Sequence, residues 1–214
     1  MIELDVHLSK DEEVVVLHDR TLQRTSTGNG AVRRYTTHEL SAFDAGSWFD
    51  PQFSAERVPT LRDVLTEAKG KCWVDVEIKS HLFHREPNGL LERRVMEIVR
   101  ACGMEEAVMF SSFDHALAAS MKNLYPSSRV GVLYNMYRDF GKKPSDLAQR
   151  AGAEIFVCGK HELTRRMLEN AKSNGLALYV YTVNSIDAAQ SAVALGVDGI
   201  ISDNADEIIP FVKR

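Results

Sequence analysis

The sequence predicts an α/β fold in which parallel strands alternate with helices, and within that class it favours the eight-stranded TIM barrel, (β/α)8. Two observations lead to this prediction. Short runs rich in Val, Ile and aromatic residues alternate along the chain with longer runs of helical period. Charged side chains lie on one face of two strands and at strand ends, where a barrel carries its active site. The 214 residues, 44% hydrophobic and 26% charged, suit one folded domain over residues 1–214.

The predicted elements follow one another in a regular order. The strand candidates, each short and rich in β-branched or aromatic residues, are Ile2–Leu8, Val14–His18, Cys72–Lys79, Ala107–Ser112, Arg129–Leu133, Glu154–Cys158, Leu176–Val183 and Asp198–Ser202. The helix candidates are Leu61–Lys69, Leu90–Ala101, Asp114–Tyr125, Pro144–Ala151, Leu163–Ser173, Ile186–Leu195 and Asp206–Lys213. Residues typical of N-caps stand at the start of three of these helices, and glycines stand at the end of three; they are Thr60, Thr164, Ser185, Gly103, Gly175 and Gly196.

The second strand candidate does not fit the βα repeat. Only the five residues Ser9–Glu13 separate it from the first, too few for a parallel crossover, so the two form an antiparallel hairpin. A two-residue turn at Asp11–Glu12 would pair residues whose numbers sum to 23, which places His18 opposite Asp5. The other seven strands are expected to run parallel, one fewer than a complete barrel has.

Composition excludes several classes of protein. The formal charge of −4 offers no attraction for phosphate backbones, so we expect no nucleic-acid partner. No apolar run reaches the ~18 residues of a transmembrane segment, and the N-terminus lacks a signal-peptide pattern, which predicts a cytoplasmic protein. The three cysteines are too widely spaced for a disulfide framework or a zinc site and are expected to be buried reduced thiols. The sequence does not predict an oligomeric state.

Two strands direct acidic groups to one interior. In Ile2–Leu8 the period of two places Glu3 and Asp5 on the same face, and in the third strand it places Glu77 and Lys79 on one face. An unpaired carboxylate inside a barrel costs several kcal/mol. Glu3, Asp5 and Glu77 would form an all-oxygen site for Mg²⁺ or Ca²⁺, with Lys79 left to pair a bound anion. The alternative is an interior salt-bridge network of Glu77 with Lys79 and Arg20.

The predicted hairpin assigns a role to one histidine. His18 would lie beside the metal ligands, placed for proton transfer to an oxygen bound at the cation. His7 is interpreted as a hydrogen-bonded structural residue. The remaining histidines fall in predicted loops or helices and are expected at the surface; they are His38, His81, His84, His115 and His161.

The long stretch Arg20–Pro59 follows the His18 strand and is predicted to cross the barrel mouth, where its Trp48 and Phe49 would shape a substrate pocket. The alternative is a packed cover over the edge of the barrel. Ser112 and Asp114 precede a helix, and N-capping explains them better than catalysis.

Eight segments of the chain, in order, resemble the glycerophosphodiester phosphodiesterase family. They are IELDVHLSKD, VVVLHDRTLQRTSTGNG, FDAGSWF, VPTLRDVL, VDVEIK, FSSFDH, YTVNS and GVDGIISD. They are spread along the chain, so the resemblance extends over essentially the whole sequence. The resemblance implies a TIM barrel of the PLC-like phosphodiesterase type that needs a divalent metal ion, Mg²⁺ or Ca²⁺. It also implies hydrolysis of glycerophosphodiesters, small molecules of glycerol and lipid metabolism, to sn-glycerol 3-phosphate and an alcohol.

The resemblance also implies roles for individual residues. Glu3 and Asp5 match the family's E-x-D metal ligands, Glu77 matches its third ligand, and His18 matches one of two catalytic histidines. In the family a glycerol hydroxyl is thought to attack phosphorus, with one histidine as base and the other as acid. Contacts with the substrate are assigned to Lys79 near the phosphate, to Trp48 in the long loop, and to Tyr181 at a position where the family usually has tryptophan.

The sequence departs from the family in several places. The family opens with an H-R-G strand and a helix near E-N-T that are not in this sequence, so we expect a barrel without its first βα unit. Glu12 stands where a turn glycine is common, and Asp75 where asparagine is common. A catalytically impaired barrel remnant that binds metal or phosphate without efficient turnover therefore stays an alternative to the enzyme. A third interpretation, an aldolase-type barrel, needs an apolar surround for its Schiff-base lysine, and the acidic surroundings of Lys79 disfavour it.

Overall fold

The structure is a computed structural model that describes residues 1–79 and 89–212. The chain divides into two compact units, Met1–Phe110 and Ser111–Arg214, and each is described by itself. The single domain predicted over the whole chain stays a prediction. Among the described helices, none combines the length and the apolar character needed to cross a membrane.

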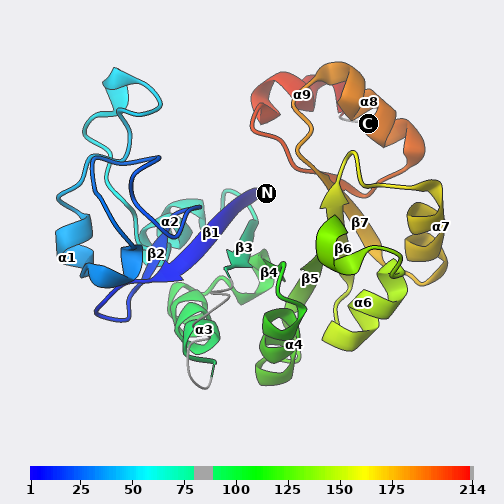
Figure 1. Cartoon of the computed structure of the whole chain (residues 1–214), viewed down its shortest axis with the longest axis horizontal. Helices are drawn as coiled ribbons and strands as arrows, with labels where there is room; N and C mark the ends of the chain where they lie inside the picture. The colour runs from blue at the N-terminus through cyan, green and yellow to red at the C-terminus, as the bar shows by residue number, and fades with distance from the viewer. Residues whose placement is uncertain (80–88, 213–214) are drawn as a thin grey trace. The chain divides into compact units, whose positions relative to one another are not determined.

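The first unit holds a sheet with the strand order β2-β1-β3-β4 (Figure 1). Its strands are β1 (Ile2–Leu8), β2 (Val14–Val16), β3 (Val74–Ile78) and β4 (Val108–Ser112), the last of which crosses the division between the units. Strand β2 is antiparallel to β1, and β3 is parallel to it. The helices are α1 (Thr37–Leu40), α2 (Leu61–Ala68) and α3 (Leu90–Cys102), with short 3₁₀ turns at Val32–Arg34, Pro51–Phe53 and Glu105–Ala107.

In the second unit, parallel strands lie in the order β5-β6-β7-β8. They are β5 (Arg129–Leu133), β6 (Ile155–Gly159), β7 (Ala177–Tyr181) and β8 (Gly199–Ile200). The helices are α4 (His115–Leu124), α5 (Met136–Asp139), α6 (Pro144–Ala151), α7 (Arg165–Ser173), α8 (Ile186–Leu195) and α9 (Ala205–Val212). The α/β repeat predicted from the sequence is therefore confirmed, because every predicted strand and helix has a counterpart within a few residues.

The helix ends follow the capping signals. Thr60 forms a capping box with Asp63 at the start of α2, and the side chains of Thr164 and Ser185 accept backbone N–H groups at the starts of α7 and α8. Gly103 ends α3 in the left-handed region at φ 63°, a conformation that other residues adopt only at a cost. The sequence did not predict the four-residue helices α1 and α5, which are too short to show a helical period.

The hairpin of β1 and β2 forms as predicted, but its register is shifted by one residue. The structure pairs Val6 with Val16 and Leu8 with Val14, so that paired numbers sum to 22, not 23. The turn has three residues, not two, because Ser9 N–H donates to Glu13 O at 2.9 Å and Glu12 takes a left-handed φ of 62°. Glu13 N–H also donates to Ser9 Oγ at 3.0 Å, and this side-chain bond holds the longer turn.

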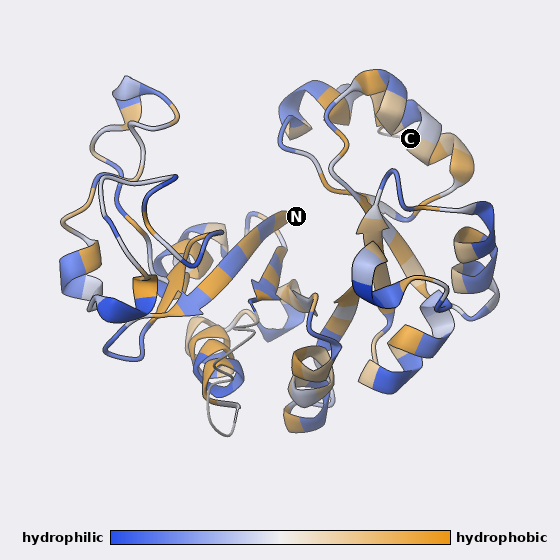
Figure 2. Ribbon diagram, viewed as in Figure 1, coloured by the Kyte–Doolittle hydropathy of each residue, from blue (hydrophilic) through white to orange (hydrophobic). Residues whose placement is uncertain are grey.

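Strand β1 alternates hydrophilic and hydrophobic residues along its length (Figure 2). Its apolar residues Leu4, Val6 and Leu8 are buried, but so are Asp5 and His7 on the opposite face. Burying each Val or Leu side chain stabilises the fold by ~1.5–3 kcal/mol. Burying Asp5 and His7 on the opposite face gives no such hydrophobic stabilisation. The sheet thus places a polar interior beside an apolar core.

Residues 20–59 pack as a cover on β2. Their apolar side chains form a small core with Val15 and Leu17; its buried members from the cover are Leu22, Val32, Leu40 and Val58. This is the packed cover left open as an alternative by the sequence. Trp48 and Phe49 lie outside that core, with 54% and 73% of their surfaces exposed.

The cysteines and histidines show where burial differs from expectation. All three cysteines are free thiols, yet only Cys158 is fully buried, and Cys72 and Cys102 are half-buried. His38 and His161 are exposed as predicted, and His81 and His84 lie outside the described residues. The prediction that His115 is a surface group is wrong, because its Nε2 lies 3.0 Å from Leu133 O and only 17% of its side chain is exposed.

Candidate active site

Three carboxylates from two neighbouring strands meet in the first unit. The parallel register of β1 and β3 places Asp5 beside Glu77 and Glu3 beside Asp75. One oxygen each from Glu3, Asp5 and Glu77 lies within 4.8 Å of the other two, and within residues 1–79 and 89–212 this is the one such group of possible metal ligands. Because Ca–O distances are 2.3–2.6 Å, oxygens up to about 5 Å apart can share one Ca²⁺ ion. The structure therefore brings together the three predicted ligands, whose role as ligands stays a prediction.

Lys79 lies between two of these carboxylates. Its Nζ is 2.7 Å from Asp5 Oδ1 and 2.7 Å from Glu77 Oε1, and 17% of its side chain is exposed. Part of the alternative salt-bridge network is thus present. Arg20, its other expected member, is exposed.

One lysine does not balance the acidic groups around it. Desolvation, followed by repulsion from Asp5, Asp75 and Glu77, raises the pKa of the partly exposed Glu3 to about 8. Desolvation raises the pKa of Glu77 above its ordinary value despite the ion pair with Lys79. Desolvation alone would lower the pKa of Lys79, but Glu77 and Asp5 outweigh it, so this pKa is raised and the ammonium stays charged. The group therefore carries an excess of carboxylates that a divalent cation would relieve.

His18 follows β2 and exposes 65% of its side chain. Its Nδ1 lies 2.7 Å from Asp19 Oδ1, and Arg24 donates two bonds to the same carboxylate, from Nε at 2.6 Å and from a terminal nitrogen at 2.9 Å. Hydrogen bonds from Arg24 and His18 hold the pKa of Asp19 well below its usual range. Since an ionised carboxylate only accepts hydrogen bonds, the Nδ1 of His18 carries the proton and Nε2 is left for exchange with another molecule.

The corrected hairpin register changes how His18 is placed. Leu17, not His18, stands opposite Asp5, with Leu17 N–H donating to Asp5 O at 3.0 Å. His18 therefore lies beyond the end of β2 and not opposite Asp5, although its charge still lowers the pKa of Glu77. Nε2 of the buried His7 lies 3.3 Å from His18 O, as expected for a hydrogen-bonded residue, and its structural role stays a prediction.

The two predicted aromatic contacts lie apart in the sequence and in different units. Trp48 Nε1–H donates to Ala45 O at 2.9 Å, and its ring packs edge-to-face on Phe49. Tyr181 ends β7 in the second unit, where its hydroxyl donates to Tyr134 O at 3.4 Å. Their contact with a substrate stays a prediction.

Sequence reasoning missed the partners of His18. Asp19 directly follows the histidine, and Arg24 comes five residues after Asp19. Arg24 lies in a loop whose two ends, Arg20 and Val32, are joined by a hydrogen bond from Val32 N–H to Arg20 O at 3.0 Å. An aspartate next to a candidate catalytic histidine was the available signal. The predicted N-capping by Asp114 is confirmed, because its side chain accepts from Ala116 N–H, and Ser112 Oγ accepts from Asp114 N–H.

Residues 1–207 match the family model described as "Glycerophosphoryl diester phosphodiesterase family". The chain belongs to this family. Among curated relatives, the glycerophosphodiester phosphodiesterase of Caldanaerobacter subterraneus subsp. tengcongensis is 33% identical over 214 residues, which cover 100% of this chain and 86% of the relative. That of Bacillus altitudinis is 30% identical, over 97% of this chain and 84% of the relative.

Solved structures share the fold. A glycerophosphodiester phosphodiesterase from Agrobacterium tumefaciens superimposes with a TM-score of 0.82 at 28% identity, covering 97% of this chain and 85% of that one. A phosphodiesterase from Oleispira antarctica, solved in complex with its product sn-glycerol-3-phosphate, gives a TM-score of 0.88 at 22% identity over 98% and 83% of the two chains. The α/β fold and the family of phosphoric diester hydrolases are thus established for this chain.

Proposed function

We propose that this protein is a metal-dependent phosphodiesterase that hydrolyses glycerophosphodiesters to sn-glycerol 3-phosphate and an alcohol, within glycerophospholipid metabolism. The observation that carries the proposal is the convergence of Glu3, Asp5 and Glu77, two of which share a single lysine, in a chain of this family. The TIM-barrel architecture of the PLC-like type, without its first βα unit, belongs to the same proposal and is supported by the likeness to solved phosphodiesterases.

The donor set fits a hard divalent cation. Glu3, Asp5 and Glu77 offer only oxygen ligands, which suit Mg²⁺ or Ca²⁺. Desolvation raises the pKa values of Glu3 and Glu77, so a bound cation would favour the ionised form of both carboxylates. These three residues would hold the ion. When bound, such an ion neutralises charge on the phosphoryl oxygens of a diester.

The remaining residues bind the substrate and transfer protons. Lys79 keeps its charge because its pKa is raised, so it can pair with the substrate phosphate. His18 Nε2 accepts a proton from the substrate or donates one to it, while Asp19 keeps the other ring proton on Nδ1. Trp48 and Tyr181 are proposed to contact the glycerol or the alcohol of the substrate. A cytoplasmic location and the lack of a nucleic-acid partner stay predictions from the sequence.

The rival functions have less support. A Schiff-base lysine needs a lowered pKa, and that of Lys79 is raised, so the aldolase interpretation is disfavoured. The non-catalytic remnant is disfavoured by relatives 30–33% identical that carry the name of the enzyme.

The test is release of sn-glycerol 3-phosphate from glycerophosphodiesters of choline, ethanolamine and glycerol, with and without chelator and with Mg²⁺ or Ca²⁺ restored. We expect turnover that chelation abolishes and that His18→Ala lowers by about 10²–10⁴-fold. His38→Ala, an exposed histidine on α1, is the matched control and should leave turnover unchanged. Undiminished turnover in chelator would contradict the metal dependence, and metal binding without turnover would favour the remnant.

A further inference from the structure

The loop that follows β5 reverses the usual distribution of polar and apolar side chains. In residues 135–143, Tyr137 and Phe140 are 98% and 81% exposed and Met136 is 46% exposed, whereas Asp139 is fully buried. Normal protein surfaces bury large apolar side chains and expose carboxylates. A loop that does the opposite indicates an interaction site.

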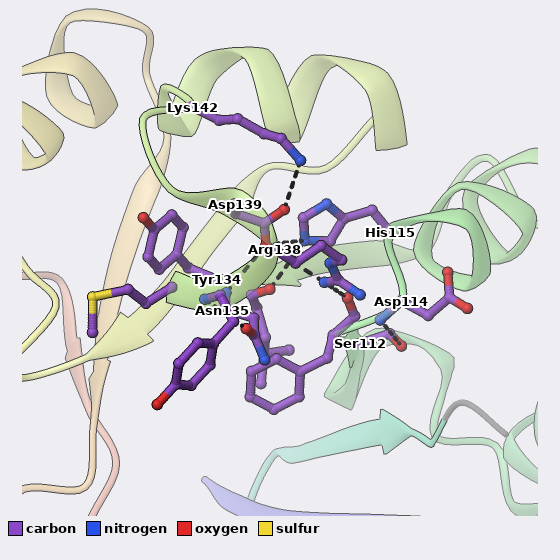
Figure 3. A network of polar contacts seen from close by, with 12 residues as sticks. Ser112, Asp114, His115, Tyr134, Asn135, Arg138, Asp139 and Lys142 are labelled. Atoms are coloured by element: carbon purple, nitrogen blue, oxygen red, sulfur yellow. Dashed lines mark hydrogen bonds and ion pairs between the residues drawn. The ribbon is translucent and has the colours of Figure 1, made fainter. Parts of the chain in front are cut away.

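Polar contacts hold this loop in its outward-facing conformation. Asp139 accepts from Asn135 N–H at 3.1 Å and from Lys142 Nζ at 3.0 Å, and His115 and Arg138 flank it at 3.7 and 3.5 Å (Figure 3). The Asn135 side chain caps α5, and the Arg138 guanidinium also donates to Phe113 O. The backbone is thus anchored by its one buried side chain, and Met136, Tyr137 and Phe140 are held outside.

A second loop, residues 159–166, lies beside the first and is also rich in cationic side chains. Met136 N–H donates to Glu162 Oε1 at 3.1 Å, and the same carboxylate accepts from Gly159 N–H at 2.8 Å, so Glu162 joins the loops after β5 and β6. These strands are parallel neighbours, so both loops leave the same edge of the sheet. Together residues 135–143 and 159–166 carry six cationic and two acidic side chains, in a chain whose formal charge is −4. The cationic residues are Arg138, Lys142, Lys143, Lys160, Arg165 and Arg166.

We propose that this basic aromatic surface, residues 135–143 and 159–166, docks on a membrane of anionic phospholipids. Cationic side chains near such a membrane are attracted by its negative surface potential, and exposed aromatic and Met side chains enter the headgroup region. Both acidic residues of the surface are already engaged by the loop contacts, which leaves its positive charge in excess. The proposal does not depend on the proposed catalytic activity.

A lipid surface explains the aromatic residues better than a nucleic acid does. A nucleic-acid groove needs cations that follow a backbone, with aromatic rings for stacking. Here three large apolar side chains, one of them an aliphatic thioether, project from one short loop between cations, as in surfaces that bind membranes.

The experiment is sedimentation of the full chain with vesicles of phosphatidylglycerol and phosphatidylcholine, or of phosphatidylcholine alone. We expect binding to the anionic vesicles that weakens with salt, and little binding to the neutral ones. Tyr137→Ser with Phe140→Ser should weaken it about tenfold or more, as for loss of a buried Phe side chain. Arg165→Gln with Arg166→Gln should weaken it about fivefold per residue.

Matched controls separate the surface from general effects. Phe211→Ser removes an aromatic residue, 53% exposed, from α9, and Arg129→Gln with Arg150→Gln removes two exposed cations from the start of β5 and the end of α6. Both controls should bind vesicles like the parent chain, and circular dichroism should show that all variants are folded. Equal binding by the loop variants and the controls would overturn the proposal. Binding to single-stranded RNA but not to anionic vesicles would do so as well.

Discussion

Two groups of buried charged residues, one in each unit, differ in the charges placed around their carboxylates. In the first unit Glu3, Asp5 and Glu77 lie close together and one lysine pairs with Asp5 and Glu77, with Asp75 buried beside Glu3 in the neighbouring strand. In the second unit a single carboxylate, that of Asp139, has Lys142, Arg138, His115 and a backbone N–H around it. The first region has more acid than base, and the second more base than acid.

The pKa values follow this difference. Desolvation, together with acidic neighbours, raises the pKa of Glu3 to about 8. Desolvation also acts on Asp139, but hydrogen bonds from Lys142 and Asn135 and the charge of His115 outweigh it and lower its pKa. A buried carboxylate whose partners lie within the chain stabilises local structure, whereas a group of carboxylates in excess indicates a ligand that the chain itself does not supply.

The largest expected effect tests the acidic group. Glu77→Gln should lower the affinity for Mg²⁺ or Ca²⁺ by roughly a hundredfold or more, since a ligand charge contributes several kcal/mol, and should leave the metal-free fold intact. Calorimetric titration measures the affinity. The control is Glu67→Gln, which changes an exposed glutamate of α2 that pairs with Lys71. Undiminished affinity in Glu77→Gln would remove Glu77 from the ligand set.

The corresponding change at Asp139 in the second unit should act on stability instead. Asp139→Asn leaves Lys142 and Arg138 without their counter-charge, and because both are partly hydrated we expect a loss of about 2–3 kcal/mol, below the 3–5 kcal/mol of fully buried pairs. Urea denaturation measures the free energy of unfolding, with the exposed Asp146→Asn as control. If Asp139→Asn changed the free energy of metal binding by more than the free energy of unfolding, the contrast between the two regions would be contradicted.

Proton competition gives a third and smaller effect. The pKa of Glu3 rises from 4.5 to about 8 on folding, so the folded metal-free chain binds more protons than the unfolded chain between these values. Its stability should therefore fall as the pH rises through this window, while metal affinity should rise by up to about tenfold per pH unit as the proton leaves. Calorimetric metal titrations from pH 6 to 9 measure the slope of metal affinity against pH. Glu3→Gln should flatten it, and an unchanged slope would assign the proton to another group.

The smallest effect concerns the partner of His18. Arg24→Gln removes the two bonds that hold Asp19, so we expect turnover to fall by roughly tenfold, as for other outer partners of site residues. Stability should change by less than about 1 kcal/mol because the pair is exposed. Nitrogen chemical shifts of His18 report whether the proton stays on Nδ1. Arg24→Lys should retain more of this tautomer than Arg24→Gln, and equal spectra of the two variants would show that Arg24 does not position the histidine.

Local sequence by itself determined the order of strands and helices, since side-chain period and capping residues act over a few positions. It also determined that Glu3 and Asp5 share one face, because alternate residues of a strand always do, and that five residues between β1 and β2 require a hairpin. The same period put Glu77 and Lys79 on one face of the third predicted strand, and the parallel register of β1 and β3 brought Glu77 beside Asp5.

Only the tertiary structure decided what depends on contacts between distant residues. The Ser9 hydroxyl and the left-handed Glu12 set a three-residue turn, and one residue more in the turn moved Leu17 into the position expected for His18. His115 is partly buried where its Nε2 lies close to Leu133 O and to Asp139, and neither residue is near it in sequence. The burial of Asp139 likewise needs Asn135, Lys142 and His115 at once. The side-chain period carries no information about such contacts, because their energies arise only when separate segments meet.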